Sequence, residues 1–227
     1  MKYIYHHLGL GDHIICNGMV RLFHEKYKEI KLFCKKNNIE NVNFMFSDLN
    51  NFELIPVNND YDVIDYINKN NVHSNLIKIG FSEMSKHQPP LTFDQAFYKI
   101  AEMDFSVRFD YFRVPRNYEM EDKVYNDLNP NNEPYIFIHD DKERGFQIDK
   151  NKINSKLKII ENNTKYGLFD MLKIIENAEE IHLMQSSIKD LINSYVFTKP
   201  KIFLHLYVRN YDDDADSLGL NKITKIR

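Results

Sequence analysis

The sequence predicts an α/β protein with two consecutive halves, each built around a parallel, doubly wound sheet. Three observations predict this class. Short apolar segments rich in β-forming residues alternate with segments that carry apolar residues at helical spacing. The turn cluster Asn129-Pro-Asn-Asn-Glu-Pro134 interrupts this alternation, and the same order of strands and helices then begins again. Strands that alternate with helices in this way favour parallel sheets.

The first half is predicted to span residues 1–115. Its expected strands lie at 2–6, 30–34, 52–56 and 76–79, and its expected helices at 12–27, 39–46, 60–68 and 93–100. Thr92 and Gln95 form the sequence pattern of a capping box at the start of the last of these helices. The aromatic segment 105–115 is predicted to be extended, and Pro115 marks the expected boundary.

The second half is predicted to span residues 116–227. Its expected strands lie at 135–139, 157–161, 181–184 and 201–206, and its expected helices at 119–128, 167–177 and 186–195. A polar loop is expected at 140–145. The acidic run from Asp212 to Asp216 is interpreted as a solvated tail rather than a metal site.

The length, hydrophobic content and net charge limit the classes of protein to which this chain could belong. A chain of 227 residues with 43% hydrophobic content can bury a core, and a net charge of −3 gives no indication of nucleic-acid binding. Cys16 and Cys34 lie in apolar segments, which is typical of buried, reduced thiols. No signal peptide or run of 18 apolar residues is present, so a soluble cytoplasmic protein is expected.

The first candidate site is the turn from Gly9 to His13, where the first strand ends. Gly9 and Gly11 allow the backbone to approach a ligand closely, and Asp12 falls in the first turn of the next helix. The third glycine of a dinucleotide-binding loop is replaced by Ile14, and no phosphate-binding P-loop is present.

A carboxylate at this turn would repel a pyrophosphate. Asp12 is therefore interpreted as a base or a hydroxyl binder that faces a substrate, with His13 or His6 nearby. The alternative is that Asp12 only interacts with the helix dipole.

The second candidate site follows the strand at 135–139. His139, Lys142 and Arg144 come directly after it, and ligands of open parallel sheets bind beyond the carboxyl ends of the strands. Lys142 and Arg144 could hold a diphosphate, and His139 could contact phosphate or sugar. Two alternatives stay open: a solvated charged turn, or a divalent-metal site at Asp140 and Asp141.

The third candidate site is Gln185-Ser186-Ser187, between an apolar strand and a helix. Ser186 or Ser187 is expected to cap this helix, and hydroxyls with helix N–H groups form an anion site. Ordinary capping is the alternative. Together with Lys142 and Arg144, this turn places two phosphate-compatible segments at strand ends in one half.

These segments together resemble a compact glycosyltransferase of the GT-B type, with two Rossmann-like halves that face a central cleft. The stretch Leu8-Gly-Leu-Gly-Asp12 is similar to the Gly-x-Gly-Asp turn of the heptosyltransferase group, glycosyltransferase family 9. The usual Asp-Ser/Thr-Gly-x-x-His donor motif is represented only by Gln185-Ser186-Ser187.

The resemblance implies a metal-independent, inverting transferase without a cofactor. It would move a sugar from a nucleotide-diphosphate sugar to a hydroxyl of a glycan or glycolipid. Asp12 would be the general base of the acceptor-side half, and 116–227 would bind the donor. A glycolipid acceptor would bring this cytoplasmic protein to the membrane surface, and no nucleic-acid partner is implied.

Three alternatives remain at this stage. The chain could be a noncatalytic nucleotide-sugar or glycan-binding module of the same fold, since it is short and its donor motif is incomplete. It could be a metal-dependent GT-A transferase that uses Asp140 and Asp141. It could also be a structural assembly partner, in which case Asp12→Asn would leave its function intact.

Overall fold

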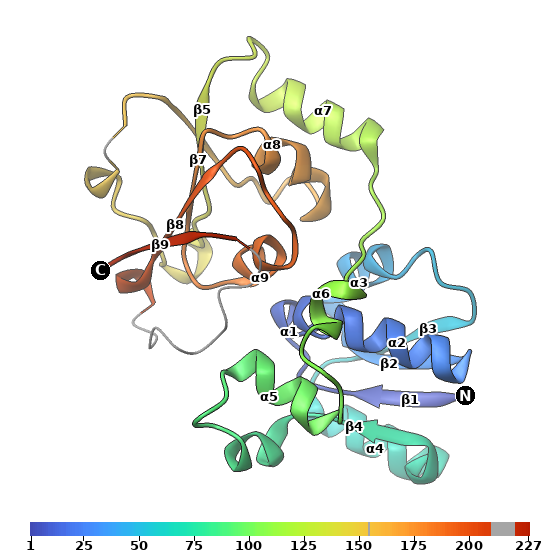
Figure 1. Cartoon of the computed structure of the whole chain (residues 1–227). Helices are drawn as coiled ribbons and strands as arrows, with labels where there is room; N and C mark the ends of the chain where they lie inside the picture. Colours follow the sequence, from blue (N-terminus) through green and yellow to red (C-terminus); the bar gives the residue numbers. More distant parts are fainter. Residues whose placement is uncertain (154, 210–220) are drawn as a thin grey trace. The chain divides into compact units, whose positions relative to one another are not determined.

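The computed structural model describes residues 1–153, 155–209 and 221–227. The chain forms two compact α/β units, and the boundary between them lies between Pro115 and Arg116 (Figure 1). The first unit contains a four-stranded parallel sheet, and the second contains a five-stranded parallel sheet. The predicted α/β class with two Rossmann-like halves is confirmed.

The first sheet has the strand order β3-β2-β1-β4. Its strands are β1 (Lys2–Tyr5), β2 (Ile30–Lys35), β3 (Phe52–Val57) and β4 (Leu76–Lys78). The helices of this unit are α1 (Leu10–Ile15), α2 (Asn17–Tyr27), α3 (Ile39–Met45), α4 (Asp60–Asn70), α5 (Phe93–Ile100) and α6 (Val107–Asp110).

This strand order creates a topological switch point between β1 and β4. The chain moves from β1 to β2 and β3 in one direction, and then crosses back to place β4 on the other side of β1. Because crossovers between parallel strands are right-handed, the connecting helices cover opposite faces of the sheet. The loops that leave β1 and β4 therefore diverge, which is where open α/β sheets bind ligands.

The helix predicted at 12–27 is wrong as a single element. The helical segment begins at Leu10 and is interrupted at Cys16, which is the C-cap residue of α1 and the N-cap residue of α2. The hydroxyl of the buried Tyr98 donates to the carbonyl of Ile15 at 2.7 Å. The carbonyl of Ile15 thus accepts a hydrogen bond from a distant side chain where the two helices separate. The local sequence pattern could not predict this interruption.

The segment predicted to be extended at 105–115 contains the short helix α6, so this prediction is also wrong. Gly18 in α2 lets α6 pack closely, because a Cβ at Gly18 would lie 2.2 Å from the carbonyl oxygen of Val107. Arg108 of α6 forms an ion pair with Asp94 of α5, and both side chains are completely buried. Removing one partner of such a pair costs about 3–5 kcal/mol.

The predicted capping box is present at the start of α5. Gln95 accepts from the backbone N–H of Thr92 at 3.0 Å.

Cys16 and Cys34 are both buried and free, as their apolar surroundings predicted. Burial raises the pKa of the Cys34 thiol to about 12, so this thiol stays protonated at neutral pH.

The second sheet has the strand order β6-β5-β7-β8-β9. Its strands are β5 (Tyr135–Ile138), β6 (Lys158–Glu161), β7 (Glu180–Leu183), β8 (Lys201–His205) and β9 (Ile223–Ile226). Its helices are α7 (Tyr118–Leu128), α8 (Leu172–Glu176) and α9 (Ser187–Ser194). The same reasoning places the switch point of this sheet between β5 and β7.

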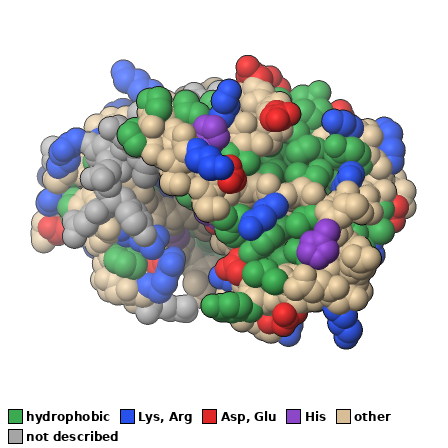
Figure 2. Space-filling model, turned by 90° about the horizontal axis from the view of Figure 1, so that it is seen from below, with side chains coloured by type: hydrophobic (Ala, Val, Ile, Leu, Met, Phe, Trp, Pro, Cys, Tyr) green, Lys and Arg blue, Asp and Glu red, His purple; other side chains and the backbone are tan. Residues whose placement is uncertain are grey.

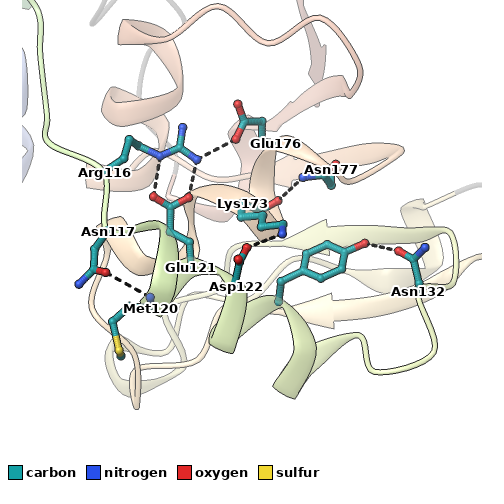
Figure 3. A network of polar contacts seen from close by, with 10 residues as sticks. Arg116, Asn117, Met120, Glu121, Asp122, Asn132, Lys173, Glu176 and Asn177 are labelled. Carbon is teal, nitrogen blue, oxygen red and sulfur yellow. Dashed lines mark hydrogen bonds and ion pairs between the residues drawn. The ribbon is translucent and has the colours of Figure 1, made fainter.

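A network of ion pairs joins α7 to α8 in the second unit (Figure 3). Arg116 contacts Glu121 through two nitrogens and also donates to Glu176 at 2.9 Å. Lys173 of α8 pairs with Asp122 of α7. Because the Glu121 side chain is only 1% exposed, its two-nitrogen contact with Arg116 satisfies a buried charge.

The end of the chain differs from the prediction. Strand β9 was not predicted, and it pairs in parallel with β8 through four residues from Ile223 to Ile226. The helix predicted at 167–177 is a 3-10 turn at Phe169–Met171 followed by the short α8. The acidic run from Asp212 to Asp216 lies outside the described residues.

Several histidines are buried in the two units. His6, His13 and His205 are at most 1% exposed, and His139 is 8% exposed. Desolvation lowers the pKa of His6, His139 and His205 to about 4, and it holds the pKa of His13 well below its ordinary value. These rings are therefore neutral in the folded protein at neutral pH.

We predict that Gly18→Ala destabilises the protein by about 1–3 kcal/mol, because its Cβ would overlap the α6 backbone. In an unobstructed helix the same change stabilises by about 0.5–1 kcal/mol. Chemical denaturation measures the difference, with Glu40→Ala on the exposed surface of α3 as the control. A gain in stability for Gly18→Ala would show that α6 does not pack there.

We predict that the free energy of unfolding falls between pH 6.5 and pH 5. The unfolded chain protonates these histidines near 6.5, whereas the folded protein protonates His6 only near pH 4. The unfolded state thus binds more protons in this window, and acidification favours it. Urea denaturation at both pH values measures the change. His6→Phe should reduce the dependence and the exposed His73→Gln should not, whereas equal stability of the wild type at both pH values would contradict the assignment.

Candidate functional site

Asp12 lies in the first turn of α1, at the switch point of the first sheet. Its side chain is 20% exposed, and one carboxylate oxygen, Oδ2, packs against Gly9. A Cβ at Gly9 would lie 2.5 Å from this oxygen. Gly9 has an extended conformation with φ of −71°, so its backbone angle does not call for glycine, but a side chain there would displace Oδ2 of Asp12 from its present place. Gly11 lies inside the first turn of α1.

The histidine beside Asp12 is His7, which the sequence analysis did not single out. Its Nδ1 lies 3.9 Å from Oδ1 of Asp12, and its side chain is 26% exposed. His13 is completely buried and its ring packs edge-on against that of His6, at 4.6 Å between centroids. His7 is therefore the partly exposed histidine beside Asp12, and His13 is not accessible from the surface. The sequence has two adjacent histidines, His6 and His7, at the end of the first strand. Because successive residues of an extended segment point to opposite faces, one of the two could have been expected on the side of Asp12.

A pocket of about 520 Å³ opens at the carboxyl ends of β5 and β6 in the second unit. Its lining residues are His139, Asp140, Asp141, Lys142, Glu161, Asn162, Asn163 and Thr164. The structure thus brings His139 and Lys142 of the predicted donor site together. The carboxylates that accompany them were not part of that prediction.

Each predicted phosphate-binding cation is paired with a carboxylate. Glu161 contacts both Lys142 and Lys150, and Asp141 contacts Arg144. The two lysines hold the pKa of Glu161 below its ordinary value. The side chains of Lys142 and Arg144 are 55% and 61% exposed, so these pairs are worth at most about 1 kcal/mol each and a stronger anion can displace the carboxylates.

Backbone contacts fix the base of this pocket. Asp140 accepts from the N–H of Ile148 at 2.8 Å, and its own N–H donates to Asn162 at 2.7 Å. The carboxylate of Asp140 therefore holds a loop in place. Burial raises the pKa of Asp140 above its ordinary value.

Gln185, Ser186 and Ser187 follow β7, on the other side of the switch point from His139. Ser186 occupies the N-cap position of α9, but its hydroxyl donates to the carbonyl of Met184 at 3.4 Å and does not cap the helix. The predicted N-cap position of Ser186 is confirmed, but its hydroxyl makes no capping hydrogen bond. The first-turn N–H groups of α9 lack acceptors within the helix, which is the property that an anion site requires.

Arg209, which follows β8, is a cation that the sequence analysis missed. Its guanidinium donates to the carbonyl of Gln185 at 2.8 Å and lies 4.7 Å from the ring centre of Phe146. It therefore approaches the Gln185–Ser187 turn from the neighbouring strand. Arg209 lies three residues after the strand predicted at 201–206, and this position near a strand end could have identified it as a candidate.

The described parts of the chain contain no group of three or more His, Cys, Asp or Glu side chains placed to hold a metal ion. Within the same parts, no helix has the length and hydropathy needed to cross a membrane. On the face drawn in Figure 2, the described Lys and Arg side chains are scattered among acidic and hydrophobic ones and form no continuous basic surface.

Comparisons of the sequence with family models and with curated proteins find no match. The structure is similar to that of a glycosyl transferase family 9 protein from Veillonella parvula, with a TM-score of 0.58 and 7% identity over 99% of this chain and 86% of that one. It is also similar to E. coli ADP-heptose LPS heptosyltransferase II, with a TM-score of 0.59 and 11% identity over 100% of this chain and 90% of that one. The chain therefore has the two-unit, GT-B-like α/β fold of these glycosyltransferases, as the resemblance at Gly9–Asp12 implied.

Proposed function

We propose that this protein is a glycosyltransferase that moves a sugar from a nucleotide-diphosphate sugar to a hydroxyl of a glycan or glycolipid. The similarity of its fold to two glycosyltransferases supports the class of reaction. The first unit, 1–115, would bind the acceptor, and the second, 116–227, would bind the donor.

The position of Asp12 carries this proposal. A partly exposed carboxylate stands at the switch point of the first sheet, in the first turn of a helix. An acceptor hydroxyl that donates a hydrogen bond to Asp12 would lose its proton to this carboxylate as the hydroxyl oxygen attacks the sugar. Gly9, which has no side chain, would leave the carboxylate of Asp12 in its present place.

The donor diphosphate would lie at the switch point of the second sheet. His139 and the turn Gln185–Ser187 stand on its two sides, after β5 and β7. The first-turn N–H groups of α9, with Lys142 and Arg144 released from their carboxylates, would stabilise the negative charge of the leaving diphosphate. His139 would orient phosphate or sugar as a neutral imidazole.

We further propose that the reaction is inverting and uses neither a metal ion nor a cofactor. The carboxylates of the second unit support the absence of a metal site. Asp140 binds the N–H of Ile148, and Asp141 pairs with Arg144, so neither is presented as one of a pair of metal ligands. The negative charge of the leaving group would then be balanced by cations and helix N–H groups of the protein.

A noncatalytic binding module of the same fold is the alternative, and one observation favours it. The cations that would bind the diphosphate are paired with Glu161 and Asp141. In that case the carboxylates and amides of the pocket would bind the hydroxyl groups of a sugar. Such a protein would bind a nucleotide sugar or a glycan, without sugar transfer or donor hydrolysis.

We predict that Asp12→Asn lowers kcat for sugar transfer at least 100-fold, because an amide cannot accept the acceptor proton at neutral pH. A thermal-shift screen first identifies a nucleoside diphosphate that binds, and donor turnover is then measured for wild type and variant. Asp65→Asn, on the exposed surface of α4, is the matched control. Unchanged turnover in Asp12→Asn would contradict the proposed base, and a wild type that binds but never turns over would favour the binding module.

We predict that Glu161→Gln raises the affinity for the same nucleoside diphosphate about 3- to 10-fold, because it releases Lys142 and Lys150 from their shared carboxylate. Lys142→Gln should lower the affinity by a similar factor, and the exposed Lys156→Gln should have no effect. Isothermal titration calorimetry at low salt measures all three. A loss of affinity in Glu161→Gln would show that its carboxylate binds the ligand directly.

A further inference from the structure

The ring of His7 is fixed at the switch point of the first sheet by the backbone after β4. The N–H of Phe81 donates to Nε2 of His7 at 2.8 Å. Gly80 makes this approach possible, because its φ is +98° and a Cβ there would lie 2.9 Å from Nε2. Only glycine adopts this backbone conformation readily and also leaves room for the ring.

Three phenylalanine rings surround His7. The ring centres of Phe81, Phe93 and Phe97 lie 4.7, 5.7 and 5.2 Å from that of the imidazole, and two of the three contacts are edge-on. Packing of this kind leaves the ring little freedom to turn. His7 is therefore held by one hydrogen bond and by rings from two separate segments of the chain.

These contacts determine which nitrogen of a neutral His7 carries the proton. Because Nε2 accepts from Phe81, the proton lies on Nδ1, which faces Oδ1 of Asp12 at 3.9 Å. The only lone pair of the neutral ring is already used. The Nδ1 proton of His7 therefore lies on the side of Asp12, at a separation longer than a hydrogen bond, and His7 is not itself a base for a substrate.

Among the residues that the structure describes, the charged groups near His7 come from α1, α4 and β4. Asp12 faces it from α1, and Asp60 from the start of α4 acts on it electrostatically while accepting from the hydroxyl of Tyr5 at 2.6 Å. Lys78 of β4 lies 4.9 Å from the ring centre of Phe81. Burial lowers the pKa of His7 below its ordinary value despite the opposing effect of Asp60, so the neutral form is favoured at neutral pH.

We propose that His7 is a positioning residue for Asp12, which holds the carboxylate ionised and oriented by donating from Nδ1 to Oδ1. Because the His7 ring is held in place, the movement of about 1 Å that brings Oδ1 within hydrogen-bond distance of Nδ1 falls to the Asp12 side chain. Oδ2 is packed against Gly9, so the two contacts together fix the plane of the carboxylate. This inference rests on the proposed role of Asp12 as the base.

The test compares His7→Phe, which keeps an aromatic ring and removes the donor, with His7→Asn, whose amide nitrogen takes the place of Nδ1. In His7→Phe, the acidic limb of the kcat profile should move up by about 0.5–1 pH unit, because an ionised carboxylate loses a hydrogen bond. The KM for the donor should stay unchanged, and His7→Asn should restore most of the shift. His73→Phe, on the exposed surface, is the control.

A second measurement does not depend on turnover. Carbon-13 NMR of the side-chain carboxyl groups follows the titration of Asp12 directly, and its midpoint should rise in His7→Phe by the same amount. An unchanged midpoint in folded His7→Phe would overturn the role of His7. A shifted midpoint in a protein without transferase activity would support the contact between the two residues and reject only the proposed function.

Discussion

The parallel register of β1 against β4 is the constraint on which the proposed acceptor site depends. Tyr5 pairs with Lys78, so two residues further along each strand His7 comes opposite Gly80, and the N–H of Phe81 reaches the imidazole. A shift of one residue in this pairing would move Gly80 and the N–H of Phe81 away from the His7 ring. The chemistry proposed for Asp12 is therefore fixed first by backbone pairing, and only then by its own side-chain contacts.

Each unit has a topological switch point beside its first strand, and different side chains stand near the two. At the first, a carboxylate stands beside a neutral imidazole and aromatic rings, which suits a hydroxyl that must lose a proton. In the second unit, cations and carboxylates line the ends of β5 and β6 and α9 begins after β7, which suits a ligand with phosphate and hydroxyl groups. The carboxylates that pair with Lys142 and Arg144 make binding there a competition between anions.

Most of the fold could be predicted from the sequence, because strands and amphipathic helices repeat with clear periods. The division at Cys16 could not be predicted, since it coincides with a hydrogen bond from Tyr98, 83 positions along the chain from Ile15. Asp12 could be singled out because a glycine turn and an acid are local signals. The role of His7 could not, because its neighbours Gly80, Phe93 and Phe97 are distant in sequence and meet it only through the β1–β4 pairing.

If the donor binds to the second unit, its phosphate groups do not contact the Gly9–Asp12 turn. Backbone amide NMR during titration with a nucleoside diphosphate distinguishes the two locations. We expect chemical-shift changes at His139 and at Gln185–Ser187, while the amides of Gly9, Gly11 and Asp12 keep their positions. Changes concentrated at Gly9–Asp12 would contradict this expectation, because the glycine turn would then bind phosphate and Asp12 could not serve as the acceptor-side base.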